Sequence, residues 1–193
     1  MELKNKDLSR LRGEYKKIID DLGILTKGLS GEQMNWKPSP EKWSIAECID
    51  HLNATGEKYL EKVLPAIRNA EEKGITGNPG IKFGWFGKML RMVGLEPPPK
   101  RKVSAPKIFR PRTTGGGKLD KDKVIRDFLL LQESLIKAVE DSDGLELNKV
   151  KFSNPASNLI KIRLGDFLDF TASHERRHIW QANNVKNAEG FPA

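Results

Sequence analysis

Apolar residues recur every three or four positions in four stretches of the chain, at residues 4–27, 44–73, 119–141 and 164–187. This spacing places them on one face of an α-helix, so each stretch is predicted to form an amphipathic helix. No stretch shows sustained alternation of apolar and polar residues, and strands are therefore not expected. The pattern predicts an all-α protein that folds as a single four-helix-bundle domain over residues 1–193.

Local signals mark the ends of these helices. Ser44 followed by Glu47 is a capping-box sequence, which satisfies free backbone N–H groups at a helix start. Gly74 stands where the second helix is expected to end, and Pro65 is expected to kink that helix. The second and third helices are then joined by a long connection at residues 74–118.

This connection carries all of the basic excess of the chain. It contains ten Lys and Arg residues and a single acid, Glu96, for a charge of +9, whereas the rest of the chain sums to −1. Six prolines and the run of glycines at 115–117 predict a long loop rather than a packed element. Its positive charge suggests that it binds phosphate groups. If these belong to a nucleic acid, aromatic residues of the connection could stack on the bases. These residues are Phe83, Trp85, Phe86 and Phe109.

Residues 81–93 within the connection are amphipathic and allow two further interpretations. One helical face would carry Trp85, Phe86, Met89, Leu90 and Val93, with basic residues near the other face. Such a segment could lie on an anionic membrane, or pack over the bundle as a flap or dimer contact. We favour the flap. If it covers the histidines described below, neutralising Lys100, Arg101 and Lys102 should raise the Michaelis constant for an anionic substrate.

Composition narrows the class of protein. A single cysteine, Cys48, excludes an internal disulfide and fits a reducing compartment. The first ten residues are too charged for a secretory signal, and no apolar run approaches the roughly 18 residues of a membrane span. We therefore expect a cytoplasmic protein without a transmembrane segment, and we predict that it forms a homodimer.

The most informative polar pattern lies in the fourth predicted helix. His174 and His178 stand one turn apart on its apolar stripe, a spacing that lets both rings bind one metal ion. The third histidine of the chain, His51, lies at the edge of the stripe of the second helix. Core histidines satisfied by hydrogen bonds would show the same spacing. Gln181, one turn beyond His178, could bind substrate or be a polar core residue. Cys48, one turn before His51, could approach the metal but is better explained as a small buried side chain.

The same histidines also spell the zinc-protease motif H-E-x-x-H, with Glu175 in the position of the general base. No third ligand follows at the spacing that those proteases use. Glu175 also lies about 100° away from the histidine face, in a Glu-Arg-Arg run that reads as solvated surface. Asp166 and Asp169, near the start of this helix, are interpreted as charges favourable to its dipole.

Several of these features together resemble the DinB/YfiT-like superfamily. They are Trp36-x-Pro38, Trp43-Ser44-Ile45 with Glu47, His51-Leu52, and His174-x-x-x-His178 with Gln181. The resemblance covers residues of roughly 5–72 and 119–187. It implies an up-down-down-up bundle whose three metal ligands fall on His51, His174 and His178. Characterised relatives include transferases and isomerases that use low-molecular-weight thiols.

The leading hypothesis is therefore a divalent-metal-dependent enzyme that acts on a small molecule, as a thiol-dependent S-transferase or a hydrolase. Zinc or nickel is the expected metal, with iron or manganese as alternatives. The competing hypothesis is a non-enzymatic binding module that uses residues 74–118 on nucleic acid or another anionic partner. Catalytic residues beyond the metal ligands are not identified by the sequence.

Overall fold

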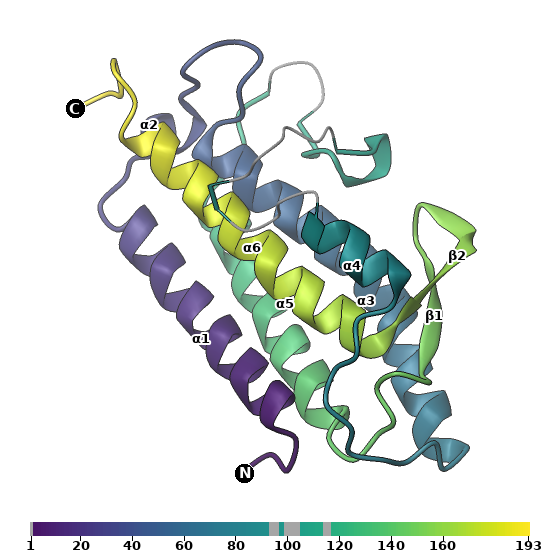
Figure 1. Ribbon diagram of the computed structural model, residues 1–193. Coiled ribbons are helices and arrows are strands. Elements are labelled where there is room, and N and C mark those ends of the chain that lie inside the picture. Colours follow the sequence, from purple (N-terminus) through teal and green to yellow (C-terminus); the bar gives the residue numbers. More distant parts are fainter. Residues whose placement is uncertain (1, 93–96, 99–104, 114–116) are drawn as a thin grey trace.

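The computed structural model describes residues 2–92, 97–98, 105–113 and 117–193, and it is mostly helical. Four long helices pack against one another (Figure 1). They are α1 (Lys6–Thr26), α3 (Ile45–Glu72), α5 (Lys121–Asp141) and α6 (Leu164–Lys186). The ends of each helix agree with the predicted ends to within about two residues, because the apolar stripe of each helix supplies the buried core. A short helix, α2 (Gly31–Asn35), was not predicted and links α1 to α3.

Side-chain contacts show how the long helices run. Arg10 near the start of α1 binds Asp169 near the start of α6, and Lys186 Nζ at the end of α6 donates to the Leu25 carbonyl near the end of α1 at 2.7 Å. The pairs advance together along the chain, so α1 and α6 are parallel. The rings of α3 meet those of α6 in the opposite order, and these two helices are antiparallel.

The predicted capping box is confirmed at the start of α3. The Glu47 N–H donates to Ser44 Oγ at 3.1 Å, and the Ser44 N–H donates to Glu47 Oε2 at 2.9 Å. This reciprocal pair fixes where α3 begins, about two turns before His51. The helix then continues through Pro65 without ending.

The prediction that strands are absent was wrong. Residues Lys151–Asn154 (β1) and Ser157–Arg163 (β2) form an antiparallel hairpin between α5 and α6. Alternation is visible only in β1, where Phe152 is buried. In β2 only Ile162 is buried, whereas Leu159 is 94% exposed, so no apolar and polar alternation marked this strand.

The basic connection is partly packed rather than wholly a loop. It contains the helix α4 (Trp85–Met92), which contacts α6, and the 3₁₀ helix η1 (Lys107–Phe109), which contacts α3. The Gly84 N–H donates to Asp166 at 3.0 Å, so this carboxylate anchors the start of α4 as well as lying in the first turn of α6. Trp85 is 79% exposed.

Other predictions for the connection have different outcomes. Phe109 is buried and is not available to stack on bases, which corrects that part of the nucleic-acid hypothesis. Val93, Glu96 and the basic residues Lys100, Arg101 and Lys102 lie outside the described residues.

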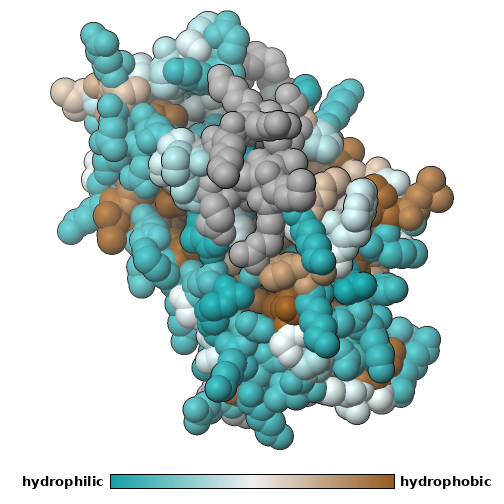
Figure 2. All heavy atoms as spheres, viewed as in Figure 1, coloured by the Kyte–Doolittle hydropathy of each residue, from teal (hydrophilic) through white to brown (hydrophobic). Residues whose placement is uncertain are grey.

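The face in Figure 2 is largely hydrophilic, with small and scattered hydrophobic spots among the described residues. Within the described part of the chain, no helix combines the length and the apolar character needed to cross a membrane.

Candidate metal centre

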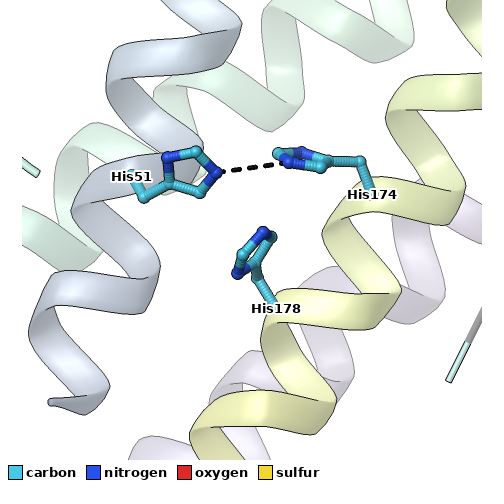
Figure 3. A group of neighbouring side chains, drawn as sticks. All are labelled: His51, His174 and His178. Carbon is cyan, nitrogen blue, oxygen red and sulfur yellow. Dashed lines mark hydrogen bonds between the residues drawn. The ribbon is translucent and has the colours of Figure 1, made fainter. Parts of the chain in front are cut away.

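The three histidines of the chain meet between α3 and α6. His51 projects from α3, and His174 and His178 project from successive turns of α6 toward it (Figure 3). One ring nitrogen of each can be chosen so that all three lie within 4.8 Å of one another. His51 and His178 are buried and His174 is half-buried. The spacing of His174 and His178 would also fit core histidines that bind no metal. In the structure, however, all three rings form a single convergent cluster.

The orientation of His51 is set by a hydrogen bond to η1. Its Nδ1 contacts the Phe109 carbonyl oxygen, which can only accept a hydrogen bond, so Nδ1 carries the proton. Nε2 is therefore left with a free lone pair. This Nε2 faces His174 Nε2 at 3.2 Å. Such a bond from the far nitrogen to a carbonyl is the usual way in which a protein orients a metal-binding histidine.

An ion pair between the buried Asp50 and the exposed Arg112 holds η1 in place beside His51. The backbone N–H of Arg112 donates to Asp50 Oδ2 at 2.6 Å, and Arg112 Nε donates to Asp50 Oδ1 at 2.9 Å. Asp50 is only 1% exposed, and the outer end of the guanidinium also reaches Glu57 at 3.2 Å. In the sequence Arg112 is one of the basic residues of the connection. Nothing there marks it as the partner of Asp50, which lies 62 positions earlier.

We expect Arg112→Ala to weaken metal binding by about ten- to a hundredfold, because the Phe109 carbonyl would no longer be held against His51. Competition titration with a chromogenic chelator measures this affinity. The matched control is Arg110→Ala, which removes an exposed arginine two positions away. Equal loss of affinity in both variants would contradict a specific role for the Arg112–Asp50 pair.

Aromatic side chains cover the histidines on two sides. Trp43 stacks on His178 with ring centroids 5.8 Å apart, and its centroid lies 4.9 Å from that of His51. Phe170 stacks on His174 at 5.4 Å. Trp43 also packs against the hydrophobic core, so its ring limits the access of water to the cluster.

Burial keeps the three rings neutral at pH 7. It lowers the pKa of His51, and it lowers the pKa of His174 and His178 well below the ordinary value for histidine. The neighbouring imidazoles and the Arg177 guanidinium lower the pKa of His174 and His178 further. Neutral imidazole is the form that binds a metal ion.

The metal-free protein is accordingly expected to lose stability as the pH falls below about 6.5, the ordinary histidine value. The unfolded chain takes up protons there, whereas the folded chain takes them up only at the lower pKa values, so acid favours unfolding. Urea unfolding at pH 7.5 and pH 5.5 measures the difference. His174→Ala should show a smaller acid-induced loss, and an unchanged loss would mean that other groups are responsible.

The residues present fit a divalent ion. Two nitrogens that bind one tetrahedral ion at about 2.0–2.1 Å lie about 3.3 Å apart, close to the 3.2 Å between His51 Nε2 and His174 Nε2. His178 Nδ1 is buried without a hydrogen-bond partner among the described residues, which is costly for a ring nitrogen that binds nothing. The spacing of the two Nε2 atoms therefore fits a shared divalent ion.

A family model described as the DinB superfamily matches residues 14–182, a span that includes all three histidines. The chain belongs to the DinB superfamily. It is 30% identical over 165 residues to the uncharacterized protein YuaE of Bacillus subtilis (strain 168), covering 83% of this chain and 87% of YuaE. No solved structure matches the chain at a significant level.

Two further residues singled out from the sequence lie close to the cluster of this DinB-superfamily chain. Gln181 is half-buried, and its hydrogen bonding raises the pKa of His178 against the larger effect of burial. Cys48 is buried, and burial raises the pKa of its thiol. Among the described residues the metal-ligand cluster consists of histidines only, so Cys48 is a small buried side chain as predicted.

Glu175 corrects the sequence analysis. It was expected on a solvated surface, but in this member of the DinB superfamily it is 1% exposed. Its Oε1 accepts a hydrogen bond from Gln132 Nε2 on α5 at 3.0 Å, and its Oε2 has no partner among the described residues. Burial raises its pKa to about 8. The 100° offset from the histidines directs this side chain into the interior of the bundle, where it meets Gln132 of α5, rather than toward water.

Proposed function

We propose that the protein is a divalent-metal-dependent enzyme that acts on a small molecule, with His51, His174 and His178 as the ligands of the ion. The observation that carries the proposal is the convergence of three neutral imidazoles, one of them oriented by the Phe109 carbonyl. A site with three protein ligands leaves coordination positions open for a reactant, as catalytic zinc sites do. Zinc or nickel is the preferred ion, and iron or manganese the alternative.

The ion would supply Lewis acidity, which lowers the pKa of a water or thiol in its open positions. The side chains around it have separate tasks. The Phe109 carbonyl holds the His51 Nδ1 proton and so keeps Nε2 directed at the cluster. Trp43 and Phe170 exclude water from two sides, and Gln181 offers an amide to hydrogen-bond a substrate.

We further propose that the reaction is a thiol-dependent S-transfer or a hydrolysis, since either needs a nucleophile that is deprotonated at neutral pH. The metal site would stand on the up-down-down-up four-helix bundle that the sequence resemblance implies. The helices α4 and η1 and the β1–β2 hairpin are added to this bundle.

The deciding experiment is elemental mass spectrometry of protein purified without a histidine tag. About one equivalent of a divalent metal per chain is the expected result, and it selects the ion for screening thiol-dependent and hydrolytic reactions. The absence of bound metal, together with no uptake from added zinc, nickel, iron or manganese, would overturn the proposal.

The alternative function, a binding module for anionic partners, makes a different prediction in the same preparations. Nucleic-acid binding through the connection would weaken steeply with salt and would not respond to chelators. Arg112 is already held by Asp50 and Glu57, so its charge is partly neutralised within the protein. The histidine cluster, which the alternative leaves without a role, favours the enzyme.

A further inference from the structure

The histidine cluster has an accessible side, and it lies along one stripe of α6. Phe170, His174, Arg177 and Gln181 follow one another at helical spacings of four, three and four residues. All four are half-buried, whereas His178 on the inner side of this stripe is buried. A small molecule that approaches the histidines therefore meets these four side chains.

Arg177 is the charged member of the stripe. Its guanidinium is close enough to the histidines to lower the pKa of all three. Among the described residues no carboxylate forms an ion pair with it, in contrast to Arg10, Arg112 and Arg176. A guanidinium that is partly withdrawn from water without an anionic partner is unfavourable, because its lost hydration is not replaced.

Two charged side chains act on the histidines, Arg177 and Asp50, and the Asp50 carboxylate is already paired with Arg112. Among the described residues the ligand cluster contains neutral imidazoles and no carboxylate, so a divalent ion bound there keeps its full charge of +2. The charge of Arg177 adds to it, and the aromatic rings of Trp43 and Phe170 lower the local dielectric constant. The balancing negative charge must then come from what binds.

We propose that Arg177 is a substrate-binding residue that pairs with a carboxylate or phosphate group of an anionic small-molecule substrate, whose reacting end lies at the three histidines. The planar guanidinium can hold two oxygens of either group at once, which fixes the direction of the substrate along the stripe. Gln181, one turn farther along, would donate a further hydrogen bond. The inference rests on the proposed function and specifies its substrate class.

The test compares the full-length metal-loaded protein with Arg177→Gln by isothermal titration calorimetry, using acetate and inorganic phosphate as probes and acetamide as the neutral isostere of acetate. Charge-assisted hydrogen bonds are strong enough that the variant should bind the preferred anion about ten- to a hundredfold more weakly. Arg177→Lys should recover only part of this loss. The acetate and phosphate titrations identify which of the two groups the site prefers.

Metal affinity provides a readout that misfolding cannot imitate. Removing a positive charge near the ion should leave metal affinity unchanged or raise it, whereas damage to the site would lower metal and anion affinity together. Arg126→Gln is the matched control, because it removes an exposed arginine of α5 and lowers the net charge equally. It should leave both affinities unchanged.

The outcomes separate this inference from the proposed function. Metal bound at one equivalent with equal anion affinity in the wild type and Arg177→Gln, or with no saturable anion binding, would overturn the role of Arg177 and leave the metal site intact. Anion binding that depends on Arg177 in a protein that takes up no metal would support the anion site and overturn the metal enzyme.

Discussion

Replacing His174 and His178 together by alanine is expected to reduce bound metal from about one equivalent to none. The two residues supply two of the three nitrogens that converge within 4.8 Å, and His51 alone has no further ligand in the cluster. Because the chain contains no histidine outside this cluster, adventitious binding to other imidazoles cannot mask the loss. Elemental mass spectrometry after exhaustive dialysis measures it.

The buried ring of His178 makes the folding of this double variant the main control. Circular dichroism and thermal unfolding should show that the helices persist. The single variant His174→Ala, which removes the half-buried ring, serves if the double variant does not fold. Undiminished metal content in a folded variant would place the ion elsewhere in the protein. The histidines would then have a structural role, and the basic connection would become the better indication of function.

Glu175→Gln is expected to stabilise the protein at neutral pH, by on the order of 3 kcal/mol at pH 7. In the folded protein burial raises the Glu175 pKa to about 8, whereas the ordinary value is 4.5. Between these values the unfolded chain has lost the proton that the folded chain retains. Stability therefore falls as the pH rises through this range and is constant above it. Glutamine does not ionise and is exempt from the loss.

The glutamine also preserves the contact with α5. It can accept from Gln132 Nε2 as Glu175 does, and its own amide can donate to Gln132 Oε1, which has no partner among the described residues. Urea unfolding at pH 5 and pH 8 should show little difference between variant and wild type at the lower pH and a large one at the higher. Glu133→Gln, at an exposed position of α5, is the control and should change stability by less than about 0.5 kcal/mol. A variant less stable than the wild type at pH 8 would contradict the pKa argument.

Prediction from the sequence was most successful where a single helix determined the outcome. The apolar spacing located α1, α3, α5 and α6 to within about two residues, because burying one stripe requires only local periodicity. The capping box at Ser44 is equally local, and it was confirmed for the same reason. The hairpin was missed because β2 buries only Ile162, so its pairing with β1 left little trace in the order of apolar residues.

For the candidate site, too, the local features could be predicted from the sequence and the tertiary contacts could not. The sequence by itself determined which residue types were available, three histidines with two of them one turn apart on the inner face of a helix. Only the tertiary structure brought His51 to them, oriented it through the Phe109 carbonyl, and secured that carbonyl with Asp50 and Arg112. It also decided that Glu175 is buried, because the side of α6 that carries it faces the interior of the bundle, where Gln132 of α5 reaches it. Helical periodicity specifies the angle of a side chain around its own axis, whereas burial, tautomer and charge environment depend on the neighbouring elements that fold against it.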